Sequence, residues 1–355
     1  MQNSNKGGVS SLPDSLRIWC SESICLIVAV VLLFVIAGCR RKSDVAKEAT
    51  ITLYGFSVVK EPLEQKIFPA YQKLWFEKTG QELTFTPSYA GSELVTNQIR
   101  SGVEADVAIL AIERNADALV KYEVTRHKWR DLPHGGIVNK TPMVILVRQG
   151  NPKKIRDFRD LGKPGVKLLL CDPIFSGAGQ WSILAIYGSE LIKSEKASGV
   201  RDEKQAFETL KRVWANVIAT PGSAREARTH FEQGEGDALV TYELEALQLV
   251  SKKLGHEMVV PPSTIFSEHP VVIIDYRMPA DKFAIVELFV RYLWEPPAQQ
   301  AWVDSGFRSV TDESLNEKFV KIKNPFYVKD LGGWSQAYPQ IIEGVWKQKI
   351  QPAGN

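Results

Sequence analysis

Short runs rich in apolar residues alternate with longer amphipathic segments along the chain from Ile51 onward. The short runs predict eight β-strands: Ile51–Tyr54, Leu83–Thr86, Val107–Leu110, Met143–Val147, Val166–Cys171, Val217–Ala219, Ala238–Val240 and Val271–Ile274. The longer segments, whose apolar residues recur at helical spacing, predict helices: Leu63–Lys78, Glu93–Arg100, Trp181–Leu191, Gln205–Trp214, Glu226–Gln233, Glu243–Leu254 and Lys282–Trp294. Strands that alternate with helices in this way are typical of parallel sheets, so the pattern predicts an α/β fold.

Proline and glycine clusters divide this pattern into three blocks, with the middle block near residues 145–265. The third block begins with a strand and soon becomes mostly helical, so we expect it to return and complete the first block. The sequence therefore predicts two lobes joined by crossing strands. Lobe I comprises residues 51–142 and 268–355, and lobe II comprises residues 143–267. Ligands of such bilobal proteins bind in the cleft between the lobes.

The amino terminus is expected to lie outside the fold. Ile24–Ala37 is a run of fourteen apolar and small residues, about 21 Å long as a helix, which is short of a bilayer core of roughly 30 Å. This length is typical of a signal peptide. Ala37 and Gly38 before Cys39 resemble a bacterial lipobox, which predicts a signal peptide at residues 1–38, a lipidated Cys39 and a tether at 39–50.

An uncleaved membrane anchor is the alternative for this segment. The side chains of residues 1–38 carry no net charge, and Arg40-Arg41-Lys42 directly follow the apolar run, an arrangement that opposes export. If the signal is removed and Cys39 carries lipid, Cys171 is the one remaining thiol, so no internal disulfide is expected. Cys171 lies in an apolar stretch and is expected to be buried and inert.

The composition is that of an ordinary globular protein, with 44% hydrophobic and 24% charged residues. The 44 basic and 41 acidic residues are interspersed, which argues against a nucleic-acid partner. The five histidines are scattered and form no HExxH motif, and the sequence has no phosphate-binding P-loop and no G-x-S-x-G motif. We therefore expect no metal, no cofactor and no enzymatic activity.

Small and hydroxyl residues precede three predicted helices: Ser88–Ser92, Phe175–Gly179 and Pro221–Ala224. Each loop offers free backbone N–H groups at the positive end of a helix dipole, an arrangement that can hold an anion without a cationic side chain. For any single loop, a serine that merely caps its own helix is the better interpretation. Three such loops in one bilobal chain favour an oxyanion cleft.

Several short motifs occur in order along the chain: Glu104–Val107, Arg148–Ile155, Asp157-Phe158, Asp160-Leu161, Lys163–Val166, Gly236–Leu239, Glu243, Glu245-Ala246 and Gly332–Trp334. Together they resemble the periplasmic sulfate/thiosulfate-binding proteins of ABC importers, from about Ile51 to Trp346. The resemblance implies a two-lobed periplasmic-binding-protein fold (type II). In that fold each lobe is a mostly parallel sheet flanked by helices, and the ligand cleft lies at the hinge.

The resemblance also implies which residues bind the anion: Ser92, Ser176, Gly177, Ala178, Ala224 and Tyr242. Ser176 is expected to donate with both its hydroxyl and its backbone N–H, and Arg225 is expected to brace the third loop. The chain departs from the family pattern at Ala178, where a glycine is usual, and at Tyr242, which replaces a tryptophan. Glu93 replaces a small residue and is expected to face solvent at its helix start. The alternative is that Glu93 lines the cleft.

The expected function is a monomeric, lipid-anchored solute-binding protein in the periplasm or at the cell surface. It would deliver sulfate or thiosulfate to an ABC permease in the inner membrane. A binding protein for molybdate or phosphate and an oxyanion-sensing receptor component remain alternatives. An anchored sulfate- or phosphate-ester hydrolase is a third alternative, for which the sequence offers no recognisable nucleophile or acid–base pair.

Overall fold

The computed structural model describes residues 49–351 of the chain. The predicted signal peptide, Cys39 and all but the last two residues of the predicted tether lie outside the described residues, so cleavage and lipidation stay predictions. Within residues 49–351, no helix combines the length and the apolar character needed to cross a bilayer.

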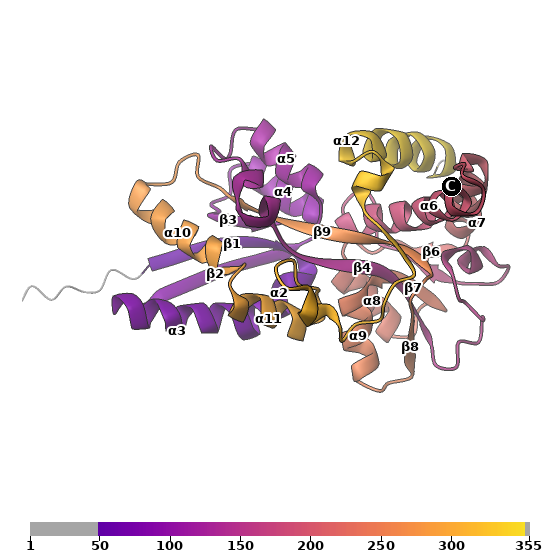
Figure 1. Ribbon diagram of the computed structural model, residues 1–355, viewed down its shortest axis with the longest axis horizontal. Coiled ribbons are helices and arrows are strands. Elements are labelled where there is room, and N and C mark those ends of the chain that lie inside the picture. Colours follow the sequence, from indigo (N-terminus) through magenta and orange to yellow (C-terminus); the bar gives the residue numbers. More distant parts are fainter. Residues whose placement is uncertain (1–48, 352–355) are drawn as a thin grey trace, which may run out of the picture. The chain divides into compact units, whose positions relative to one another are not determined.

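Ten strands form one sheet in the order β2-β1-β3-β9-β4-β7-β5-β6, with β10 paired to β9 and β8 paired to β4 (Figure 1). Their bounds are β1 Ala49–Phe56, β2 Leu83–Ala90, β3 Val107–Ile109, β4 Ile137–Arg148, β5 Leu168–Leu169, β6 Val217–Ala219, β7 Ala238–Tyr242, β8 His256–Val259, β9 Ser263–Ile273 and β10 Asn324–Phe326. All eight predicted strands are confirmed.

The helices flank this sheet. Their bounds are α2 Lys60–Pro62, the π-helix η2 Leu63–Ile67, α3 Phe68–Thr79, α4 Ser92–Arg100, α5 Glu113–Lys121, α6 Gly177–Ser198, α7 Glu203–Trp214, α8 Ala224–Glu232, α9 Glu243–Ser251, α10 Ala280–Tyr292, α11 Pro296–Asp304, α12 Trp334–Ala337 and the π-helix η8 Tyr338–Ile350. All seven predicted helices are confirmed. Short 3₁₀ turns occupy several of the connections.

The sheet has two halves that meet at two long strands. In the first sheet half, β1 pairs in parallel with β2 and β3, and α4 and α5 belong to this half. In the second sheet half, β5 pairs in parallel with β6 and β7, and α6 and α8 belong to this half. The long strands β9 and β4 run antiparallel to each other and join β3 to β7 (Figure 1). Both strands are longer than the apolar runs Met143–Val147 and Val271–Ile274 that predicted them, because the chain crosses between the sheet halves along these strands.

The carboxyl-terminal segment packs against α6 and α7 (Figure 1). The Trp334 ring contacts the edge of Trp181 with centroids 4.8 Å apart, and Trp346 contacts Trp214 at 5.3 Å. This segment is predicted to belong to lobe I, whereas its large apolar side chains are covered by helices of residues 143–267. The lobe boundaries themselves stay a prediction.

Candidate functional site

The three predicted loops meet at Gly91, which directly precedes α4. A Cβ atom at Gly91 would lie 2.6 Å from the carbonyl oxygen of Phe175 and 2.7 Å from that of Gly222, closer than such atoms can approach. Phe175 belongs to the loop before α6, and Gly222 belongs to the loop before α8. The amino-terminal ends of α4, α6 and α8 therefore converge across the two sheet halves, and only glycine fits at the meeting point.

A second close approach joins the starts of α4 and α6. A Cβ atom at Gly177 would lie 2.6 Å from the Cβ of Ala111 and 3.6 Å from the Cβ of Ser92. Ala178 and Ala224, each 2% exposed, are buried at the starts of α6 and α8. Helix geometry leaves the first backbone N–H groups of each helix without an intrahelical acceptor. The structure thus brings the predicted loop residues together, each beside an amino-terminal helix turn.

The serines of the three loops make different hydrogen bonds. The Ser223 hydroxyl accepts from the backbone N–H of Glu226 (3.2 Å) and so caps α8. The Ser92 hydroxyl donates to Oδ1 of Asn115 (3.0 Å) and accepts from the backbone N–H of Ala111 (3.0 Å). Ser223 is therefore an ordinary cap, whereas Ser92 links α4 to the start of α5.

Ser176 is 2% exposed and occupies the N-cap position of α6, but its hydroxyl does not cap that helix. Its backbone N–H donates to the carbonyl oxygen of Asp172 (2.9 Å). The expectation that this N–H serves a ligand is therefore wrong, because a turn within the loop already uses it. The hydroxyl lies beside the thiol of Cys171, which is fully buried as predicted. Burial raises the pKa of Cys171 to about 12, so the thiol stays protonated and unreactive.

Tyr242 ends β7, and its side chain is completely buried. Its hydroxyl has no hydrogen-bond partner among residues 49–351. Burial raises the pKa of Tyr242 well above its usual value, and the nearby Cys171 raises it further, so the hydroxyl is a donor at neutral pH. A buried donor without an acceptor costs about 1–3 kcal/mol. An anion oxygen would satisfy it.

Arg225, the predicted bracing residue, links the two sheet halves. Its guanidinium pairs with both carboxylate oxygens of Glu61 on α2 and with Oε1 of Glu245 on α9 (2.9 Å). Burial alone would raise the pKa of Glu61, but the hydrogen bond and charge of Arg225 outweigh burial and lower it. The two carboxylates thus neutralise the charge of Arg225, and these ion pairs have a structural role beside the loops. The sequence gives no signal for Glu61, because the pairing spans 164 positions.

Glu93 does not face solvent, so the sequence expectation for this residue is wrong. Its side chain is 14% exposed and forms an ion pair with Arg114 on α5. Its Oε1 also accepts a hydrogen bond from Nε2 of Gln180 on α6 (2.9 Å). The first turn of α4 is covered by these two helices, whose approach local sequence does not encode.

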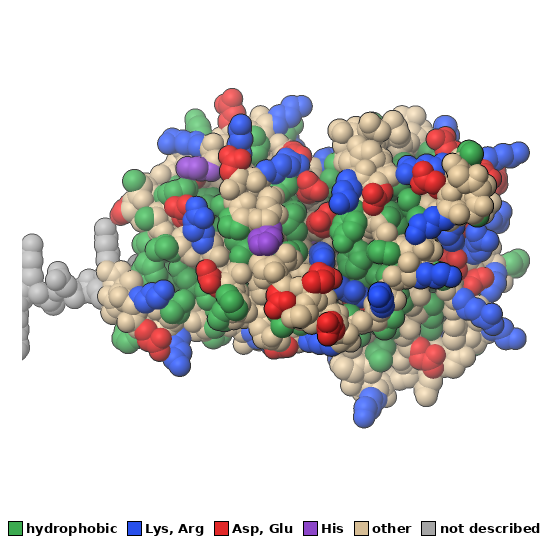
Figure 2. All heavy atoms as spheres, in the orientation of Figure 1, with side chains coloured by type: hydrophobic (Ala, Val, Ile, Leu, Met, Phe, Trp, Pro, Cys, Tyr) green, Lys and Arg blue, Asp and Glu red, His purple; other side chains and the backbone are tan. Residues whose placement is uncertain are grey.

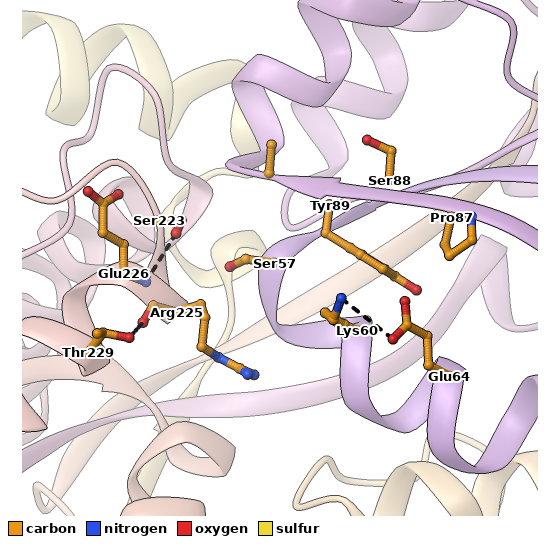
Figure 3. A pocket seen from close by; sticks show the side chains of 11 residues that line it. Ser57, Lys60, Glu64, Pro87, Ser88, Tyr89, Ser223, Arg225, Glu226 and Thr229 are labelled. Atoms are coloured by element: carbon orange, nitrogen blue, oxygen red, sulfur yellow. Dashed lines mark hydrogen bonds and ion pairs between the residues drawn. The ribbon is translucent and has the colours of Figure 1, made fainter.

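A pocket of about 500 Å³ adjoins the loops (Figure 3). Arg225 and Thr229 of α8 line one side, and Lys60 and Tyr89 lie opposite. Ser57, which follows β1, lies between the two sides and is a hydroxyl that sequence reasoning missed, since no glycine-rich loop surrounds it. On the face drawn in Figure 2, lysine and arginine side chains are interspersed with acidic ones.

Comparisons with known proteins show which family this chain is similar to. The model of the bacterial extracellular solute-binding protein family matches residues 51–308. The chain is 32% identical to a sulfate-binding protein of Synechococcus elongatus, over 94% of this chain and 96% of that protein. It is 30% identical to a thiosulfate-binding protein of Pseudomonas aeruginosa, over 80% and 87%.

A solved structure is also similar. The sulfate-binding protein SubI from Mycobacterium tuberculosis H37Rv matches with a TM-score of 0.73 and 28% identity, over 82% of this chain and 99% of SubI. The predicted family resemblance and the predicted two-lobed α/β fold are thereby confirmed.

Proposed function

This chain belongs to the bacterial extracellular solute-binding protein family, and we propose that it captures a tetrahedral oxyanion, sulfate or thiosulfate, for an ABC importer. The relatives named sulfate- and thiosulfate-binding proteins support this choice of ligand. The single observation that carries the proposal is the convergence of three helix amino termini on Gly91. The buried Tyr242 hydroxyl, which has no partner among the described residues, offers a further donor. Helix amino termini and neutral donors together form an anion site.

In this proposal the anion is held by neutral donors. The backbone N–H groups of Gly177, Ala178 and Ala224 donate from the starts of α6 and α8. The hydroxyls of Ser176 and Tyr242 are the side-chain donors. The Ser92 hydroxyl is engaged with Asn115, so Ser92 contributes the backbone N–H of its helix start.

The same donor set favours sulfate over phosphate. Sulfate carries no proton near neutral pH, so a cleft made only of donors matches it. Hydrogen phosphate retains a proton that needs an acceptor, and burying that proton without one is costly. The nearby carboxylates of Glu93, Glu61 and Glu245 are already paired with arginines, which makes them poor acceptors for a phosphate proton. Arg225 and Arg114 are neutralised in the same pairs.

We further propose that the protein is exported and lipid-anchored at Cys39, acts as a monomer, and hands its ligand to a membrane permease without any reaction. Export agrees with membership of an extracellular family. Replacement of Cys39 by serine should leave a precursor of unchanged length that fatty acid does not label. Equal labelling of the variant and the wild type would contradict the anchor.

Isothermal titration of the purified protein with sulfate, thiosulfate, molybdate and phosphate tests the proposed function. We expect one anion per chain, sulfate or thiosulfate tighter than phosphate, and nearly constant sulfate affinity from mildly acidic to neutral pH. Tighter molybdate or phosphate binding would change the assigned ligand. The absence of binding heat for every oxyanion would contradict the function itself.

A further inference from the structure

We infer that Glu93 and Arg114, both in the first sheet half, form a charge-neutral clamp that Gln180 ties to the second half, in which Arg114 keeps the Glu93 carboxylate from repelling the bound anion. The inference rests on the proposed function. Glu93 lies in the first turn of α4 and its carboxylate accepts a hydrogen bond from Gln180 in the first turn of α6, so it lies beside the helix starts that are proposed to hold the anion. A carboxylate there must be neutralised if a doubly charged anion is to bind beside it.

The clamp joins the first turns of two helices that approach from opposite halves. Gln180 lies in the first turn of α6 and donates from Nε2 to Glu93 (2.9 Å). The same Nε2 donates to the carbonyl oxygen of Pro173 (3.1 Å), which fixes the amide against the loop that carries Ser176. A parallel bond runs from Nε1 of Trp181 to the carbonyl oxygen of Ala111 (2.7 Å). Gln180 therefore connects Glu93 to the loop of the opposite half.

Arg114 is held in position from the other side. Its guanidinium lies over the ring of Tyr338, 4.0 Å from the centroid, at the start of the carboxyl-terminal helix η8. The Tyr338 hydroxyl donates to Glu343 (2.8 Å), which in turn pairs with Lys347 (3.0 Å). The Arg114 side chain is 28% exposed, so water screens its charge only in part. Arg114 is a positioning residue, because it acts on the anion through Glu93.

A purely structural contact and an electrostatic clamp predict different results for two single substitutions. Glu93→Gln keeps an acceptor for Gln180 but leaves Arg114 unpaired, which adds positive charge beside the anion. Arg114→Gln leaves the Glu93 carboxylate uncompensated next to two helix amino termini. The clamp thus predicts effects of opposite sign on sulfate affinity, whereas the loss of a structural contact would weaken binding in both variants.

The experiment is titration of the purified protein with sulfate at low and at high sodium chloride concentration. We expect R114Q to weaken sulfate binding at least tenfold at low salt and by less at high salt, because salt screens the repulsion. We expect E93Q to strengthen binding about threefold. The double variant should bind within about threefold of the wild type. K347Q, which removes a positive charge from the same network without touching Glu93, should match the wild type.

Each result decides the matter. Weaker binding in both single variants, or a double variant as weak as R114Q, would overturn the clamp while leaving the proposed function intact. A wild type that binds none of the oxyanions would overturn the function and the clamp together. If R114Q fails to fold, E93Q alone decides, since stronger, more salt-sensitive binding supports the clamp and weaker binding overturns it.

Discussion

The loops before α6 and α8 resemble each other in sequence, but they place their serines in different environments. Phe175–Gly179 and Pro221–Ala224 both put a serine beside small residues at a helix start. Ser223 is half-buried and caps α8 through the backbone N–H of Glu226. Ser176 is buried, caps nothing, and lies in front of the buried Cys171 thiol. One serine stabilises its own helix, and the other has its hydroxyl beside a thiol, which is a weak hydrogen-bond partner.

The sequence itself indicates which of the two serines caps its helix. Ser223 is followed three residues later by Glu226, the spacing of a capping box. The Glu226 carboxylate accepts a hydrogen bond from the backbone N–H of Gly222 (2.9 Å), so both side chains serve the helix start. Ser176 is followed at the same spacing by Gly179, which has no side chain to complete a box. A serine at a helix start without the matching glutamate is therefore the better candidate for a ligand donor.

Among the substitutions that test this difference between the two serines, Ser176→Ala should have the largest effect, and the effect is on anion affinity. The change removes one hydrogen bond to a charged ligand, worth about 1.5–3 kcal/mol. Sulfate affinity should therefore fall by about ten- to a hundredfold in a titration. Thermal unfolding without anion should hardly change, since the hydroxyl caps no helix. A change in affinity below twofold would make Ser176 a structural residue.

Tyr242→Phe should separate binding from stability more clearly. The substitution removes a buried hydroxyl that has no partner in the described part of the chain, so stability without anion should be unchanged or slightly higher. Sulfate affinity should fall about tenfold, or about 1.4 kcal/mol, because a donor is lost. Titration and chemical unfolding of the same variant measure both. Reduced stability with unchanged affinity would show that the hydroxyl is satisfied within the protein.

Ser223→Ala should show the opposite pattern to Ser176→Ala. Loss of the cap on α8 should lower the free energy of unfolding by about 1 kcal/mol. Sulfate affinity should change less than threefold, since the backbone N–H of Ala224 remains in place. Unfolding and titration of both serine variants under the same conditions make the comparison direct. A larger loss of affinity than for Ser176→Ala would reverse the assigned roles.

Local sequence predicted the elements of the site but not the contacts across it. The loops around Ser92, Ser176 and Ala224 could be found because strand ends and helix starts are local features. The pairs Glu61–Arg225 and Glu93–Arg114 could not, because they join residues 164 and 21 positions apart and depend on how strands are ordered and helices pack. Helix α5 also escaped prediction, because Glu113–Lys121 is mostly polar and buries only a short face.

The smallest expected effect tests whether water is excluded from the buried region around Ser176 and Tyr242. His269 on β9 is completely buried, and its ring meets the edge of the Tyr242 ring with centroids 5.7 Å apart. Burial lowers the pKa of His269 from 6.5 to about 3, so the imidazole is neutral in the folded protein. The unfolded chain binds this proton near pH 6.5, so the folded state binds fewer protons below that pH. The stability contribution is therefore present above pH 6.5 and is lost as the pH falls toward 3.

Between pH 7 and pH 6 this linkage should remove about 0.7 kcal/mol of the unfolding free energy of the wild type. The glutamine in the His269→Gln variant cannot take up a proton. Over the same pH interval, the unfolding free energy of this variant should therefore fall by about 0.7 kcal/mol less than that of the wild type. Chemical unfolding of both proteins at the two pH values measures the difference. Equal declines would mean that His269 titrates normally and that water reaches the Tyr242 ring. Water would then reach the region around Ser176 as it reaches the partly exposed Ser223, and the two serines would not differ in this respect. The Tyr242 hydroxyl would have a water molecule as its hydrogen-bond partner.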